Sequence, residues 1–195
     1  MPRIAFFTLN VAREPFSQPQ MRGFVERIPT IFAEADVASG FIAFAAAMRL
    51  PPDDPAMVWP AAKPADHEAA MTLTLWRDLE SVFAFAYSRL HAEALQMRRE
   101  WTIKPDWPTY VAWWVADDEE PDWREAARRH AMLSARGPTP DAFDFRTPFD
   151  AEGRPTPPAR KPLGLVSAAQ GRALRAATAF PPMALSGERP PRQAE

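Results

Sequence analysis

The chain of 195 residues has no cysteine, and it has only seven glycines and three histidines. The absence of cysteine excludes disulfides, thiolate metal sites and cysteine nucleophiles, and it fits a cytoplasmic protein in a reducing compartment. The scattered glycines form neither a dinucleotide-binding nor a phosphate-binding loop motif. Three isolated histidines without cysteine also argue against a dedicated zinc site.

The sequence also lacks long apolar runs and a strong charge of either sign. No run reaches the roughly 20 apolar residues that a membrane-spanning helix needs. The net charge of −2 gives no reason to expect nucleic acid or an anionic membrane as a partner. We therefore expect a cytoplasmic protein with no nucleic-acid and no membrane partner.

Proline and positive charge concentrate toward the C-terminus. From Arg146 onward the chain has nine prolines, and eight basic residues stand against four acidic ones. These stretches have few aromatic residues to bury, and proline removes backbone donors. We predict one domain over residues 1–146 and a proline-rich, mostly disordered tail over residues 147–195. The segment "LVSAAQGRALRAATAF" could form a short helix within that tail.

Hydrophobic periodicity predicts an alternation of strands and helices. Strands are expected at 4–11, 39–48, 71–76 and 109–116, and helices at 21–38, 78–99 and 122–136. Pro29 is expected to kink or split the first helix near Ile28, and Asp78 to cap the second. The "AFDF" stretch near residue 143 could add a short edge strand, and the proline-rich loop 49–68 is long enough to be functional. The order β-α-β-β-α-β plus a helix predicts an α+β, ferredoxin-like antiparallel sheet with helices on one face and an extra C-terminal helix.

The predicted strands are apolar on both faces. In the fourth strand Val111, Trp113 and Val115 point one way, and Tyr110, Ala112 and Trp114 point the other. A half-exposed sheet would alternate with polar residues instead. We predict that a second copy covers the second face, giving a homodimer through the sheet. The alternative is that the last helix or the tail folds over that face.

Four stretches resemble a known family. They are "GFVERIPTIFAEADVASGF", "LTLWRDLESVFAFAYSRLHAEALQMRREW", "YVAWWV" and "RHAMLSARGPTPDAFDF". They are similar to a bacterial family catalogued only as a domain of unknown function, which is placed with the dimeric α/β-barrel superfamily of small monooxygenases and haem-degrading proteins. The resemblance covers about residues 3–146, and its most specific parts are "H-A-E-x-L-x-x-R-R-E-W" and the paired tryptophans. It implies the fold and the dimer, but the family has no agreed activity.

The candidate site lies on the predicted helix 78–99. At helical spacing, Tyr87, His91 and Arg98 fall together along one edge of the buried stripe. His91 would act as proton acceptor or, as the resemblance implies, as axial ligand of haem, which is the candidate cofactor. Arg98 would hold a carboxylate or oxyanion. Alternatively, His91 simply hydrogen-bonds a loop.

The other histidines and the tryptophans are assigned more simply. His67 is expected to be exposed in its loop and His130 to lie on the helix surface. The tryptophans are expected in the core. A small-molecule ligand would bind to Tyr87 and to three of the tryptophans: Trp101, Trp113 and Trp114.

Two functions follow. The first is a monooxygenase-like or haem-associated enzyme that acts on a hydrophobic substrate between sheet and helices. The second is a non-catalytic ligand-binding or stress-related dimer. The sequence does not separate them.

Overall fold

The centre of the protein is a four-stranded antiparallel sheet. A computed structural model describes residues 1–44 and 67–157 of the chain. The strands are β1 (Arg3–Val11), β2 (Phe41–Phe44), β3 (Ala69–Trp76) and β4 (Tyr110–Val115), and they lie in the order β2-β3-β1-β4. Each neighbouring pair is antiparallel. This order confirms the predicted α+β class and the ferredoxin-like arrangement of strands.

Four α-helices and one short 3-10 helix, η1 (Pro19–Met21), accompany the sheet. The α-helices are α1 (Arg22–Asp36), α2 (Leu79–Ala86), α3 (Arg89–Trp101) and α4 (Trp123–Arg136). The Asp78 side chain caps α2 by accepting a hydrogen bond from Ser81 N at 2.7 Å, as predicted. The predicted tail helix and most of the loop 49–68 lie outside the described residues.

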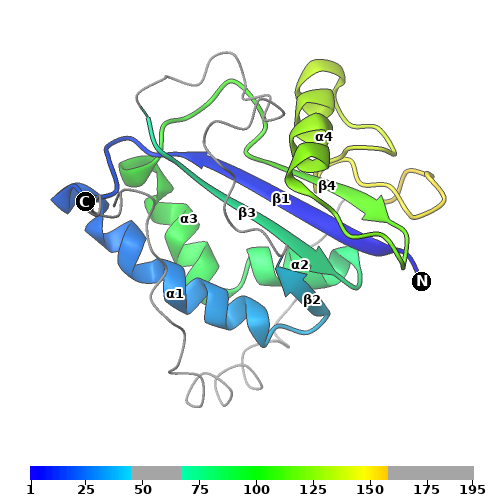
Figure 1. Cartoon of the computed structure of the whole chain (residues 1–195), viewed down its shortest axis with the longest axis horizontal. Helices are drawn as coiled ribbons and strands as arrows, with labels where there is room; N and C mark the ends of the chain where they lie inside the picture. The colour runs from blue at the N-terminus through cyan, green and yellow to red at the C-terminus, as the bar shows by residue number, and fades with distance from the viewer. Residues whose placement is uncertain (45–66, 158–195) are drawn as a thin grey trace, which may run out of the picture.

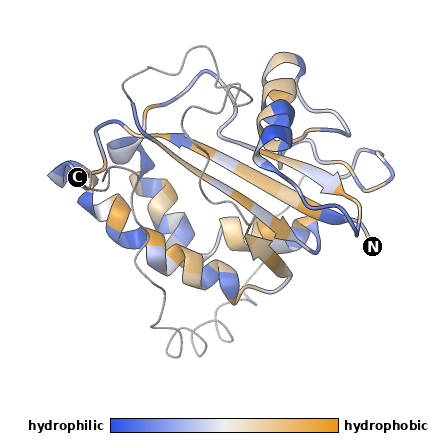
Figure 2. Ribbon diagram, viewed as in Figure 1, coloured by the Kyte–Doolittle hydropathy of each residue, from blue (hydrophilic) through white to orange (hydrophobic). Residues whose placement is uncertain are grey.

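Helices cover both faces of the sheet. Figure 1 shows α1, α2 and α3 on one side and α4 on the other. On the first side Ile4, Phe6 and Trp76 pack with α1 and α2. On the second side, Trp113 and its neighbours pack with residues of α4. Figure 2 shows the matching hydropathy, with strands that are largely hydrophobic and an α4 that carries both kinds of residue.

The sequence left open the alternative that the last helix folds over the second face of the sheet, and α4 does so. The apolar residues of the second face, on which the homodimer prediction rested, are buried within one chain. Val111 is fully buried, and Trp113 is only 1% exposed. The homodimer stays a prediction, but the two apolar faces of the sheet no longer argue for it.

The predicted continuous helix 78–99 is wrong. The chain leaves the helical conformation at Tyr87 and Ser88, and Ser88 is extended, with φ −59° and ψ 158°. The Ser88 hydroxyl donates to Glu34 of α1 at 3.4 Å. The Ala86 carbonyl meets the His91 ring instead of a helical amide. Contacts with another helix and with a side chain thus replace the lost helical turn.

Pro29 does not split the first helix, in contrast to our expectation. α1 is a single helix of 15 residues with Pro29 inside it. Proline at this position cannot donate to the carbonyl of Val25, so one helical hydrogen bond is lost. The apolar face of α1, with Ile31 and Ala35, packs on the core of the sheet and holds the helix across that point.

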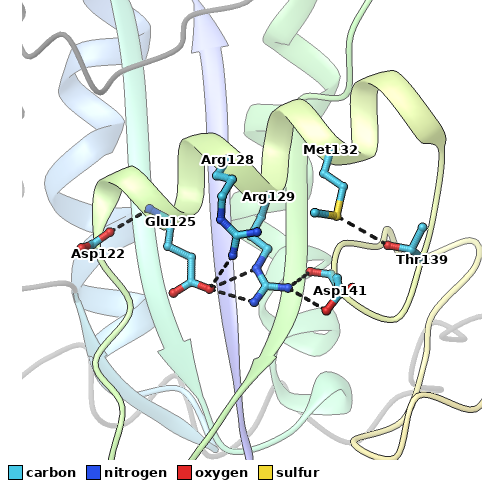
Figure 3. A network of polar contacts seen from close by, with 7 residues as sticks. All are labelled: Asp122, Glu125, Arg128, Arg129, Met132, Thr139 and Asp141. Carbon is cyan, nitrogen blue, oxygen red and sulfur yellow. Dashed lines mark hydrogen bonds and ion pairs between the residues drawn. The ribbon is translucent and has the colours of Figure 1, made fainter.

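The segment after α4 continues the sheet. Phe143 forms a two-way backbone bridge with Ala112 of β4, close to the predicted edge strand. Arg129 fastens this segment to α4, because its guanidinium donates to Glu125, to the Asp141 carboxylate and to the Asp141 carbonyl (Figure 3). The edge of β4 is therefore occupied by the chain itself.

Ordered packing extends beyond residue 146, where we placed the end of the domain. Pro148 and Phe149 are buried. The Trp114 indole donates to the carbonyl of Phe149 at 2.8 Å. The segment 147–157 is thus anchored to the sheet through Pro148 and Phe149, while the rest of the predicted tail lies outside the described residues.

Candidate functional site

His91 lies at the junction of α2 and α3. Its Nδ1 is 2.8 Å from the carbonyl oxygen of Ala86, and its ring stacks on Phe85 at 5.2 Å between centroids. A carbonyl only accepts, so Nδ1 carries the hydrogen. Burial lowers the pKa of His91, against the opposing effect of this hydrogen bond. The neutral ring therefore has its lone pair on Nε2, where it can accept a proton or bind a metal.

The sequence predicted that Tyr87, His91 and Arg98 lie along one edge of a single helix, and the structure does not have this arrangement. Tyr87 is the residue after α2, whereas His91 and Arg98 belong to α3. The helical spacing from Tyr87 to the other two is lost at the break. Arg98 is exposed, which removes the geometry expected for a buried carboxylate clamp.

The three predicted ligand-binding tryptophans are not brought together. Trp113 is buried on the face that α4 covers, and Trp114 packs on the opposite face. Trp101 lies in a third cluster with Ala12 and Met21, and the guanidinium of Arg27 sits 5.2 Å from the centre of its ring.

A row of hydroxyl groups crosses the sheet on the face of α1–α3. Thr8 of β1 pairs in register with Thr72 of β3 and with Tyr110 of β4. The hydroxyl oxygens of Thr8 and Thr72 are 2.7 Å apart. The Tyr110 oxygen accepts a hydrogen bond from the Phe145 amide at 3.3 Å. We call Thr8, Thr72 and Tyr110 the hydroxyl row.

An aromatic cluster borders the hydroxyl row. Tyr110 lies 4.9 Å from Phe145 and 5.5 Å from Phe6, measured between ring centroids. Phe145 continues to Phe83 at 5.2 Å, and Phe83 continues to Tyr87 at 4.6 Å. This aromatic cluster contains both tyrosines of the chain. Tyr87 is 40% exposed, so one end of the cluster reaches solvent.

Electrostatics keep the site uncharged near neutral pH. Burial raises the pKa of Tyr110 to about 12, and the charge of Asp144 adds to this while the Phe145 amide and Arg146 oppose it. A phenol with that pKa stays protonated. His91 stays neutral for the reason given above. The hydroxyl row and the histidine thus supply dipoles and not charges.

The hydroxyl row lies where the sheet face is partly open. Thr8 and Thr72 are on the two central strands, and both are partly exposed. Further along the same strands, Ile4 and Trp76 are fully buried, and Thr74 binds the Trp76 indole at 2.8 Å.

The neighbouring helix does not seal the open region. Among the α3 side chains that the structure describes, only Trp101 is buried. α3 lies on this side of the sheet and runs toward the end of β1 (Figure 1). Solvent therefore reaches the sheet face beside α3, whereas α2 seals the other end.

The other two histidines have structural partners. His130 is only 2% exposed, so the prediction of a surface residue was wrong. Its Nε2 is 2.6 Å from the Pro108 carbonyl oxygen, its ring meets Phe7 edge-on, and burial lowers its pKa. His67 is partly buried, with Nδ1 2.6 Å from the carbonyl of Ala12.

The hydroxyl row was missed at the level of sequence. Its signal was present, since Thr8 and Thr72 are polar residues within largely apolar strands. The register that aligns them with Tyr110 is a tertiary property. In the described part of the chain, no group of three or more acidic or histidine side chains is arranged to hold a metal ion.

A family model described as "Domain of unknown function (DUF3291)" matches residues 3–159. The chain belongs to the DUF3291 family. The DUF3291 match spans every strand and helix described above and includes the packed segment 147–157. No curated protein and no solved structure matches the chain. No helix in the described ranges is both long and apolar enough to cross a membrane.

Proposed function

We propose that the protein binds a small aromatic molecule against the partly open sheet face beside α3. The observation that carries the proposal is the partial exposure of Thr8 and Thr72 on central strands, beside stacked aromatic rings. Binding sites for small molecules combine apolar walls with a few directed polar groups. The two accessible rings of the aromatic cluster, Tyr110 and Tyr87, supply the walls, and the hydroxyl row supplies the polar groups.

The test fills the open region with a larger side chain. Thr72→Phe adds a ring on the open face, whereas Met71→Phe, its matched control, adds one on the opposite face of the same strand. Ligand-detected NMR with naphthalene-class compounds measures binding to each variant. We expect Thr72→Phe to weaken binding at least about tenfold, equal to about 1.4 kcal/mol, while Met71→Phe leaves it unchanged. Equal binding by both variants would place the ligand elsewhere and refute the proposal.

A second candidate function is oxidation of the bound molecule. It is favoured by His91, whose Nδ1–H is anchored to a backbone carbonyl so that Nε2 holds the lone pair. Such anchoring is typical of histidines that accept protons or bind metals. His91 would be the general base or, if haem is bound, the residue that holds its iron, and the oxidant would be dioxygen, which haem would activate when bound.

Haem titration tests the cofactor form of this candidate. A Soret shift that appears with the parent protein and disappears with His91→Asn would support His91 as ligand, because asparagine keeps the bond to Ala86 but has no Nε2. A spectrum that is the same for both would refute that role. In the non-catalytic alternative, the protein binds the small molecule but does not oxidise it.

The finer superfamily assignment also stays a proposal. The strand order β2-β3-β1-β4 and the position of α1, α2 and α3 on one face support placing DUF3291 with the dimeric α/β barrels. In that arrangement two copies would join through their sheets, and α4 would have to lie at the margin of the contact. The mass in solution tests this directly.

A further inference from the structure

We infer that the hydroxyl row selects a ligand with a neutral hydrogen-bond acceptor, such as an aryl ketone, over an aryl carboxylate of the same size. The inference rests on the proposed function and specifies its ligand class. It follows from three properties of the site: the hydrogens that remain available, the absence of a buried cation, and the aromatic border.

The first property is the supply of donors. Thr8 and Thr72 share one hydrogen bond, so one hydroxyl hydrogen of the pair is used and the other remains. The Tyr110 oxygen accepts from the Phe145 amide, so its own hydrogen also remains. Within the described ranges neither remaining hydrogen has an acceptor. The row thus offers two O–H donors to a ligand.

The raised pKa of Tyr110 keeps the hydrogen on its phenol oxygen. With a pKa raised to about 12 by burial, the phenol does not ionise near neutral pH and donates a hydrogen bond without giving up its proton. The Tyr110 oxygen already accepts from the Phe145 amide, and its own hydrogen remains available to an acceptor on a ligand.

The second property is charge. The charged groups that act on Tyr110 are Asp144 and Arg146, which have opposite signs. Arg98, the cation expected to hold a carboxylate, is exposed on α3. Moving a carboxylate out of water without a paired cation costs far more than moving a ketone. The site therefore discriminates against the anion.

The third property is shape. Phe6, Phe145 and Tyr110 stack within 5.5 Å of one another, measured between ring centroids. Rings packed at such distances attract a further aromatic ring by offset or edge contacts. Phe6 and Phe145 are buried and Tyr110 is partly exposed, so a planar aromatic body would lie against the Tyr110 ring with its carbonyl oxygen toward the hydroxyl row.

The experiment compares three naphthalenes of similar size: 2-acetonaphthone, 2-naphthoate and 2-ethylnaphthalene. Each is titrated into the full chain at neutral pH and followed by ligand-detected NMR. We expect 2-acetonaphthone to bind about tenfold more tightly than either of the others, the worth of one net hydrogen bond. Tyr110→Phe should remove most of that advantage, and Thr8→Val part of it.

Thr30→Val is the matched control, because it deletes an exposed threonine hydroxyl on α1, outside the hydroxyl row and the aromatic cluster. It should leave the preference unchanged. Tightest binding by 2-naphthoate, or equal binding by all three compounds, would overturn the inference but leave aromatic binding intact. Absence of binding by all three, or insensitivity to Thr72→Phe, would instead refute the proposed function together with the inference.

Discussion

Replacing His91 tests whether the junction of α2 and α3 depends on its imidazole. His91→Ala removes the donor for the Ala86 carbonyl and the ring that stacks on Phe85. An orphaned carbonyl costs about 1–3 kcal/mol when buried, and an aromatic pair contributes about 0.5–1.5 kcal/mol. Because His91 is only half-buried, water can reach part of the site. We expect a loss of about 2 kcal/mol in the free energy of unfolding.

His91→Asn separates the two contributions. The asparagine amide can place a donor where Nδ1 lies but cannot stack like a ring, so it should recover about 1 kcal/mol. Gln96→Ala, on the exposed surface of the same helix, is the control and should change stability by less than about 0.5 kcal/mol. Urea unfolding followed by circular dichroism measures all three.

Two results would refute the reasoning about His91. If His91→Ala unfolds at the same urea concentration as the parent, the bond to Ala86 has no net worth. If His91→Asn is as unstable as His91→Ala, the donor at Nδ1 is not what holds the junction. The first result would leave Nε2 as the reason for a histidine at this position, and the second would leave the stacking of the ring on Phe85 as its structural contribution.

Three further predictions concern pH, backbone conformation and assembly. Burial lowers the pKa of His91 and His130 from 6.5, so below about pH 6.5 the unfolded chain binds more protons than the folded chain. The free energy of unfolding should therefore fall as the pH falls through that window. Urea midpoints should show this fall, and it should be less steep in His91→Asn. Gly40→Ala should lower the melting temperature more than Gly137→Ala. Both glycines have positive φ, but only the new Cβ at position 40 would overlap the Ser81 side chain, 2.6 Å from its Cβ; equal shifts would contradict this. Light scattering at micromolar concentration tests the homodimer, which the mass of a single chain would refute.

Periodicity predicted the strands and α4 well, because those patterns are local. The alternation in β4 put Trp113 and Trp114 on opposite faces, and the structure confirms it. The stretch "FAFAYSRLHAEAL" contains no glycine or proline, so nothing local signals the break at Tyr87. At that break, Ser88 contacts Glu34 of α1, and the Ala86 carbonyl contacts His91 of α3.

The candidate site was predicted only in part. His91 was identified, but its partners Ala86 and Phe85 were not, because they depend on the break between α2 and α3. The hydroxyl row was missed because a register between strands cannot be read from one strand at a time. His130 shows a different failure. It lies three residues after Ala127 and three before Leu133, on the buried stripe of α4. The neighbouring arginines suggested a surface, although the spacing already indicated burial.

The place of β1 in the sheet has a consequence for synthesis on the ribosome. β1 is made first, yet its partners come much later: Ile4 pairs with Trp76, and Arg3 pairs with Val115. Until those residues have left the exit tunnel, Phe6 and Phe7 have no strand beside them. Long-range pairing of this kind slows folding and prolongs the exposure of apolar segments. The nascent chain therefore keeps the apolar side chains of β1 unpaired until the segments that form β3 and β4 have been translated.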